Sequence, residues 1–140
     1  MRPDIQKLIA HRRHCVLATA VDNRPYCSLM AYTASDDGTC IFLVTHRHTR
    51  KFKNLLANPS VSLLIDSRET DAPQALTIVG TAEEMPPGKE KNAVQERLLT
   101  VHPDLRELAA HPGAAVIRVR VRQVIFLNGL TDAYHETMAP

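Results

Sequence analysis

The sequence predicts a mostly antiparallel β fold of the α+β class, a small barrel or sandwich with helices inserted between its strands. Short runs rich in Val, Ile, Leu, Phe and Thr are separated by turn residues and do not alternate regularly with helices, so hairpins are favoured over parallel βαβ units. The 140 residues contain no internal repeat and no low-complexity linker, so we expect a single domain over residues 1–140.

The helices and strands follow from hydrophobic periodicity. A short helix is expected over residues 4–13, where Ile5, Leu8 and Ile9 share one face. Later helices are expected over residues 50–57, 89–101 and 105–110, the last two separated by His102-Pro103. Strand-like runs occupy residues 15–21, 26–34, 39–45, 60–66, 76–85 and 114–127.

Turn and breaker residues separate these elements. Residues 22–25 and 35–38 combine Asp, Asn, Ser, Pro and Gly and predict the first two turns, and Pro86-Pro87-Gly88 interrupts the chain before the third helix. Asn128-Gly129 predicts a turn after the last strand, and the residues beyond it show no clear pattern. Gly80, inside the fifth strand, predicts a β-bulge or a close backbone approach.

Composition excludes several classes of protein. A net charge of +2 is too small to indicate nucleic-acid binding by itself, and no apolar run approaches the roughly 18 residues of a membrane span. The N-terminal residues lack the apolar core of a signal peptide. Three cysteines without CxxC spacing predict buried, reduced thiols of a cytoplasmic protein and no bound metal, with a zinc site built from cysteine and histidine as the alternative. From the small net charge and the lack of a long apolar run we expect no nucleic-acid and no membrane partner.

Residues 45–59 carry the most informative pattern. Phe52, Leu55 and Leu56 have the spacing of one buried helix face, Thr49 is a suitable N-cap, and Asn58-Pro59 ends the helix. The charged residues of its first turn are all basic, and no acidic residue occurs between Asp37 and Asp66.

A helix N-terminus already carries partial positive charge, and each exposed cation there costs about 0.3–1 kcal/mol. Arg50, Lys51 and Lys53, with Arg47 just before them, therefore predict a bound anion. A phosphate suits both the cations and the free N–H groups of the helix start. The alternative is an ordinary solvated helix face.

The order of these pieces resembles the pyridoxamine 5′-phosphate oxidase-like family of FMN-binding split barrels. A Leu-Ala-Thr-Ala strand is followed by a strand opening on Arg-Pro-Tyr, then by Thr-(x)3-Thr-Arg-Lys, Asn-Pro-Ser-Val-Ser-Leu and Val-Gly-Thr-Ala-Glu. The resemblance covers residues 5–84 well and the C-terminal strand loosely.

The resemblance implies a homodimeric, six-stranded antiparallel split β-barrel with flanking helices and with FMN at the dimer interface. The strand after the proline would lie along the flavin ring, and Thr49, Arg50 and Lys51 would hold the phosphate. A strand-end threonine and, beside Ala75, a glutamine would also contact the cofactor. The cofactor-binding residues implied are Ser28, Leu29, Met30, Ala31, Tyr32, Thr33, Val44, Thr45, Thr49, Arg50, Lys51 and Gln74.

The sequence departs from the vitamin B6 enzymes of this family. Those enzymes have basic residues at the positions of Ser28 and Thr33, and Arg47 or Lys53 could supply the missing positive charge here. They also carry a C-terminal Arg-Leu-x-Pro segment, which this chain lacks. The resemblance therefore implies a flavin-dependent oxidoreductase of unknown small-molecule substrate, not a true pyridoxamine phosphate oxidase.

Other functions stay open at this level. A haem-binding or haem-degrading split barrel would use His46 or His48 as a ligand, and a deazaflavin would present the same phosphate as FMN. A non-catalytic module would use the basic loop to bind nucleic acid or an acidic partner, although an aromatic content of 4% argues against base stacking. Arg118, Arg120 and Arg122 share one strand face, which predicts an exposed or interfacial face paired with acidic residues.

Overall fold

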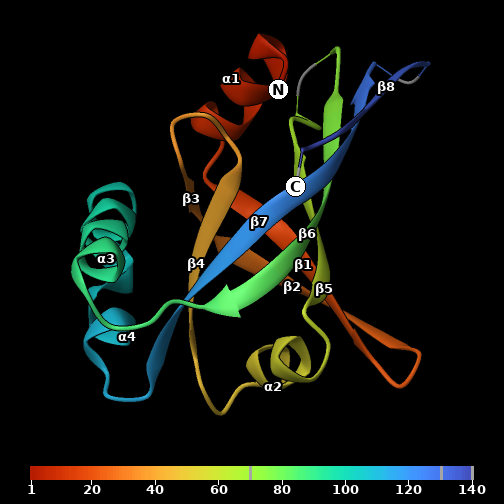
Figure 1. Ribbon diagram of the computed structural model, residues 1–140. Coiled ribbons are helices and arrows are strands. Elements are labelled where there is room, and N and C mark those ends of the chain that lie inside the picture. Colours follow the sequence, from red (N-terminus) through yellow and green to blue (C-terminus); the bar gives the residue numbers. More distant parts are fainter. Residues whose placement is uncertain (70, 130, 140) are drawn as a thin grey trace.

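The computed structural model describes residues 1–69, 71–129 and 131–139, and it shows a curled antiparallel sheet with flanking helices (Figure 1). The predicted fold class is thereby confirmed. The helices are α1 (Pro3–His11), α2 (Arg50–Ala57), α3 (Lys89–Val101) and α4 (Arg106–Ala110), with a 3₁₀ turn at Pro103–Leu105. The strands are β1 (His14–Val21), β2 (Arg24–Ala31), β3 (Thr33–Ala34), β4 (Cys40–His46), β5 (Ser60–Asp66), β6 (Gln74–Glu84), β7 (Ala114–Asn128) and β8 (Asp132–Thr137).

The predicted strand count of six was wrong, because the described residues form eight strands in one sheet. The run predicted over residues 26–34 is divided at Tyr32 into β2 and β3. The second addition is β8, which pairs with β7 over Gln123–Asn128. Most of the β8 side chains are exposed, so its sequence lacks the apolar alternation that would have revealed a strand.

The sheet must curl because of where its edges lie. The strand order is β2-β1-β5-β6-β7-β4-β3, which places β2 and β3 at opposite ends of the path. Only Tyr32 separates these two strands in sequence, so the two ends of the sheet have to approach one another. This connection converts an open antiparallel sheet into a split barrel.

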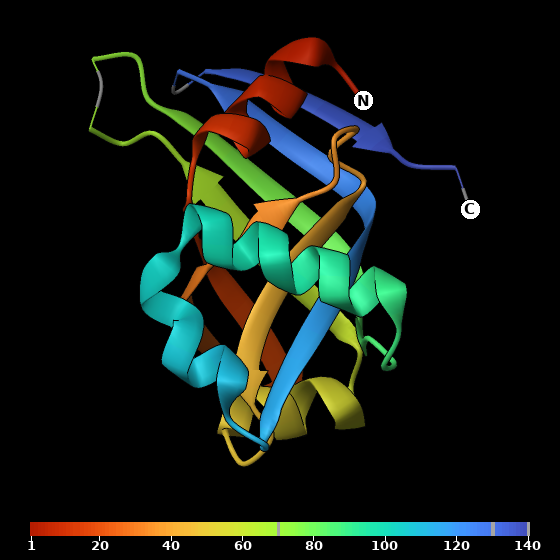
Figure 2. The ribbon, with the colours of Figure 1, turned by 90° about the vertical axis from the view of Figure 1, so that its left-hand side faces the viewer.

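Alternation along the strands fills the interior of this barrel. Leu17, Leu63 and Ile78 come from adjacent strands, and each is at most 2% exposed. A smaller apolar cluster lies outside the sheet, where Val94 and Leu98 of α3 pack on Phe42, Val44 and Val116. Figure 2 shows α3 running across the sheet on this side, and Figure 1 shows α1 and α2 at opposite ends of the barrel. Among the described helices, none is long and apolar enough to span a membrane.

Two predictions about individual residues have opposite outcomes. Gly80 does lie at an irregularity, since the register between β6 and β7 shifts between Val79 and Gly80. The three cysteines are not all buried. Burial raises the pKa of Cys15 to about 12, but Cys27 is exposed because it lies on the outer face of the edge strand β2.

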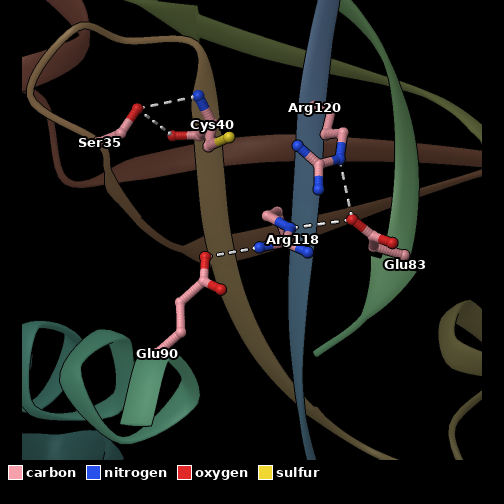
Figure 3. A network of polar contacts seen from close by, with 6 residues as sticks. All are labelled: Ser35, Cys40, Glu83, Glu90, Arg118 and Arg120. Atoms are coloured by element: carbon pink, nitrogen blue, oxygen red, sulfur yellow. Dashed lines mark hydrogen bonds and ion pairs between the residues drawn. The ribbon is translucent and has the colours of Figure 1, made fainter. Parts of the chain in front are cut away.

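A network of arginines and glutamates joins α3 to the sheet (Figure 3). Arg118 donates from Nε to Oε1 of Glu83 at 2.9 Å and from Nη1 to Oε1 of Glu90 at 2.7 Å, and Arg120 donates to the same Glu83 oxygen at 3.0 Å. The hydrogen bond from Arg118 and the charges of both arginines lower the pKa of Glu83. Arg118 and Arg120 are thus paired with acidic residues, as the spacing predicts, whereas Arg122 on the same face donates to the Thr81 hydroxyl.

Replacing Arg118 with alanine is expected to lower the free energy of unfolding by about 1–2 kcal/mol, because this half-buried guanidinium, 12% exposed, serves two carboxylates. Arg122→Ala is the matched control. Arg122 is exposed, and within the described residues its guanidinium bonds to the Thr81 hydroxyl alone, at 3.2 Å, so the expected change is about 0.5 kcal/mol or less.

Urea unfolding at several pH values checks this prediction. The pKa of Glu83 is depressed by folding, so its contribution is present above the ordinary value of 4.5 and is lost as the pH falls through the folded value. The difference between wild type and Arg118→Ala should therefore shrink in acid. Equal stability of the two arginine variants at neutral pH would contradict the assigned role.

Candidate functional site

A cavity of about 250 Å³ lies between β2 and β4, beside the first turn of α2. Of the residues predicted to bind a cofactor, those lining it are Leu29, Met30, Ala31, Val44, Thr45, Thr49 and Lys51. In the described part of the chain, β2 pairs with β1 alone, and Leu43–His46 of β4 pair with β7 alone. The cavity therefore opens between two strand edges whose backbone groups can still pair with a ligand.

The sequence around Thr49 shapes the start of α2. The Thr49 hydroxyl donates to the His46 carbonyl at 2.8 Å and accepts from the Phe52 N–H at 3.3 Å, so it caps the helix as predicted. The buried Thr45 hydroxyl lies 3.2 Å from the Thr49 hydroxyl. Because Thr49 already donates its proton to His46, Thr45 is the donor in this second hydrogen bond. Because the cap uses the Phe52 N–H, the N–H groups of Arg50 and Lys51 are left at the open end of the helix.

The charges at this helix start have no internal counterpart. The first turn of α2 contains no acidic residue, and among the described residues no carboxylate pairs with Arg50, Lys51 or Lys53. Lys51 lines the cavity, so its ammonium is the cation best placed to meet an anion there.

The other nearby cations point elsewhere. Arg50 donates to the Tyr26 hydroxyl at 3.3 Å, and its guanidinium lies over the Tyr26 ring, 5.2 Å from the ring centre. Arg50 also lines a separate cavity of about 310 Å³, together with Lys53. Arg47 pairs with Glu84 and donates to the Ala114 carbonyl at 2.9 Å. Arg47 is therefore not free to supply the charge that Ser28 and Thr33 lack.

Four of the predicted residues lie away from the cavity in addition to Arg50. Tyr32 and Thr33 are buried, and the Tyr32 hydroxyl donates to the Ile9 carbonyl at 2.6 Å. Ser28 is half-buried on β2 but does not line the cavity. Gln74 begins β6 at the end of the sheet opposite α2. It lies roughly 20 Å along the strand from Thr81, which pairs with Ser60, the first residue of β5 after α2.

Three residues that line the cavity were not predicted as part of a flavin site. Leu105 and Leu108 reach it from the 3₁₀ turn and α4, about 50 residues beyond the basic helix, and no local pattern links the two segments. His46 also lines the cavity, although the sequence indicated it only as a possible haem ligand.

His46 belongs to a cluster of three imidazoles. Its ring lies 4.1 Å from the rings of both His48 and His111, and its Nε2 lies 2.8 Å from Nδ1 of His111. The Gly113 N–H also donates to this His111 nitrogen at 2.9 Å, so that nitrogen accepts and His46 must donate from Nε2. The Nδ1 of His46 then keeps a bare lone pair, which is buried and has no hydrogen-bond partner among the described residues.

The environment of His46 favours its neutral form. Burial lowers the pKa of His46, and the neighbouring His48, His111 and Arg47 lower it further. The contribution of His46 to the free energy of unfolding is therefore fully present above its ordinary pKa of 6.5. This contribution is lost as the pH falls through the lower pKa of the folded state. No three His, Cys, Asp or Glu side chains in the described ranges are arranged to hold a metal ion.

The melting temperature of wild type is thus expected to fall between pH 7.5 and pH 5, and His46→Gln should make that fall smaller. His135→Gln, on the exposed strand β8, removes a histidine far from the cluster and should keep the wild-type slope. Thermal unfolding followed by circular dichroism at both pH values measures the difference. A slope unchanged by His46→Gln would show that this imidazole is not the destabilising group.

Comparisons with known proteins agree with this fold. The family model described as pyridoxamine 5′-phosphate oxidase matches residues 1–128. A pyridoxamine 5′-phosphate oxidase homolog of Schizosaccharomyces pombe is 31% identical over 75 residues, which cover 48% of this chain and 40% of that protein.

Two solved structures illustrate the range of similar folds. A haem-binding protein from Mycobacterium smegmatis has a TM-score of 0.84 at 23% identity, over 98% of this chain and 59% of that chain. A FAD-binding protein from Mesorhizobium loti has a TM-score of 0.77 at 21% identity, over 94% of this chain and 92% of that chain. At these identities the structures show a shared fold.

The chain spans less than two thirds of the length of the S. pombe relative and of the M. smegmatis protein. The family match, in contrast, extends over nearly the whole sequence and includes both walls of the cavity and the basic helix. On these grounds the chain belongs to the pyridoxamine 5′-phosphate oxidase family.

Proposed function

We propose that the protein binds FMN in the cavity between β2 and β4 and acts as a flavin-dependent oxidoreductase on a small molecule. The observation that carries this proposal is the start of α2, where Lys51 lines the cavity and no carboxylate among the described residues pairs with it. A flavin phosphate supplies the missing charge.

The remaining residues of the cavity suit the rest of the cofactor. The Thr45 and Thr49 hydroxyls lie next to the phosphate position, and the edge of β2 at Leu29–Ala31 offers backbone groups and apolar side chains to a planar ring. FMN, when bound, supplies the electron-transfer chemistry, and the chain binds it, orients it and shields it from water. The family's usual basic residues are replaced at Ser28 and Thr33, which supports a substrate other than pyridoxamine phosphate.

The proposed FMN site needs a second copy of the chain. A cavity of about 250 Å³ is smaller than the roughly 300–1,000 Å³ of most cofactor sites. At its mouth Leu29 is 75% exposed, and the outer face of the sheet beyond it carries the partly exposed apolar residues Val16, Leu64 and Val79. A homodimer packed on this face would complete the cavity, and sedimentation equilibrium of the pure protein tests that assembly.

An absorption spectrum and an FMN titration test the cofactor. The purified protein should be yellow, or should quench the fluorescence of added FMN with a micromolar dissociation constant. A colourless protein that leaves FMN fluorescence unchanged at micromolar concentrations would exclude the proposal. A deazaflavin is distinguished in the same measurement by its different absorption bands.

Haem is the second candidate, and the buried, unpartnered Nδ1 of His46 favours it. An iron porphyrin requires an axial ligand such as an imidazole nitrogen, and His46 is among the residues that line the cavity. Addition of haem should then produce a Soret band that His46→Ala shifts or removes. A haem spectrum that is identical in wild type and His46→Ala would exclude His46 as the ligand.

A further inference from the structure

A second cavity beside α2, of about 310 Å³, lies next to the proposed flavin cavity but shares no lining residue with it. We call it the α2 basic cavity, and it is lined by His48, Arg50, Lys53 and Asn54. The two cavities are neighbours, because the His48 ring lies 4.1 Å from the ring of His46, which lines the flavin cavity.

The α2 basic cavity carries positive charge without an internal counterpart. Within the described residues no carboxylate pairs with Arg50, Lys53 or His48. None of the described residues that line the cavity is acidic. Two full positive charges, from Arg50 and Lys53, therefore face this space together with the imidazole of His48.

Two of the lining side chains are held in place by the strands behind them, unlike the side chains of a solvated helix face. Arg50 donates to the Tyr26 hydroxyl at 3.3 Å, and its guanidinium lies over the Tyr26 ring. Tyr26 of β2 pairs with Thr19 of β1, and the buried Thr19 hydroxyl accepts from the Asn54 amide at 3.2 Å. The same strand pair thus positions Arg50 and Asn54, which reduces the entropy lost when a ligand orders them.

Asn54 supplies a buried polar group that is only half satisfied. It is 7% exposed, and its bond to Thr19 uses one end of the amide, while the other end has no partner among the described residues. The Thr19 hydroxyl makes no other hydrogen bond in that part of the chain, so it can donate as well as accept. With the amide rotated by half a turn, Asn54 keeps this bond and presents its NH₂ group to the cavity that it lines.

The α2 basic cavity does not lie on the face that a second copy of the chain would cover. Side chains alternate along β2, so Tyr26 lies on the opposite face of the strand from Leu29, which borders the proposed dimer contact. The wall formed by Tyr26 and Arg50 therefore stays outside that contact.

A phosphate group fits this set of donors better than a carboxylate does. It carries up to about two negative charges and three acceptor oxygens, which match two cations, an imidazole and an amide, whereas a carboxylate offers one charge and two oxygens.

We propose that the α2 basic cavity binds a second phosphate group, distinct from the flavin phosphate at Lys51. This group belongs either to a longer flavin, the dinucleotide FAD, or to a separate phosphorylated ligand that binds beside FMN. The site rests on the contacts of this cavity, while its assignment to the cofactor rests on the proposed function.

Titration calorimetry of the full-length protein with FMN, FAD and pyrophosphate tests the site and separates the two sources. If the second phosphate belongs to the cofactor, FAD binds about tenfold more tightly than FMN, and Lys53→Ala removes this advantage while FMN affinity changes by less than about twofold. If it belongs to a separate ligand, FAD has no advantage, and pyrophosphate binds FMN-saturated wild type at least about fivefold more tightly than FMN-saturated Lys53→Ala. Lys89→Ala, which removes an exposed lysine from the first turn of α3, is the matched control and should behave like wild type in every titration.

Three results would overturn this proposal. Affinities for FAD and pyrophosphate that are both unchanged by Lys53→Ala would exclude the site, and so would equal affinities for FMN and FAD without any pyrophosphate binding. An equal loss of FMN and FAD affinity in Lys53→Ala would assign Lys53 to the flavin site. If FMN does not bind, pyrophosphate is titrated into the protein alone. Binding that Lys53→Ala weakens and Lys51→Ala leaves unchanged would then preserve this site and remove the proposed flavin function, so the two failures are distinguishable.

Discussion

Replacing both Arg50 and Lys51 with alanine is expected to weaken FMN binding by about ten- to a hundredfold, while riboflavin binding changes by no more than about threefold. The two ligands share the ring and differ in the phosphate, which meets the open end of α2 in the proposed complex. Lys51 lines the cavity, whereas Arg50 rests on Tyr26, so Lys51→Ala alone should account for most of the loss.

Fluorescence titrations of FMN and riboflavin against the same set of variants measure this difference. Lys53→Ala is the matched control, because it removes a charge from the same helix at a residue that does not line the flavin cavity. If the double variant lost affinity for FMN and riboflavin equally, these residues would support the structure of the site and not the phosphate.

Gly80→Ala is expected to lower the free energy of unfolding by about 1–3 kcal/mol, the usual cost of overpacking a well-packed interior. A Cβ at Gly80 would lie 2.7 Å from the Arg120 carbonyl oxygen and 2.6 Å from a Val119 methyl group. The carbonyl belongs to the backbone of the neighbouring strand, so relief requires β6 and β7 to separate at the bulge.

Chemical denaturation with urea provides the measurement for Gly80→Ala. Thr77→Ala, on the outer side of the same strand, should change the unfolding free energy by less than about 1 kcal/mol. A stability of Gly80→Ala equal to that of wild type would show that the two strands can move apart at this point without cost.

Most elements of this fold could be predicted because their signals are local. The helix N-cap at Thr49, the basic first turn and the bulge at Gly80 all follow from residues a few positions apart. The exposed strand β8 could not be predicted in this way, because a strand that buries little has no reason to alternate. The exposure of Cys27 likewise depends on β2 being an edge strand, which is a property of the whole sheet.

From the sequence alone come the helices, the strands that bury apolar residues, the basic start of α2 that predicts an anion, and the resemblance to a flavin-binding family. The set of residues that share the cavity depends on how distant segments pack. This packing brought Leu105 and Leu108 to Lys51, turned Arg50 toward Tyr26 and directed Arg47 to Glu84. The physical reason is that helix caps and charge patterns act within a few residues, whereas the walls of a cavity are set by packing between segments that are distant in sequence.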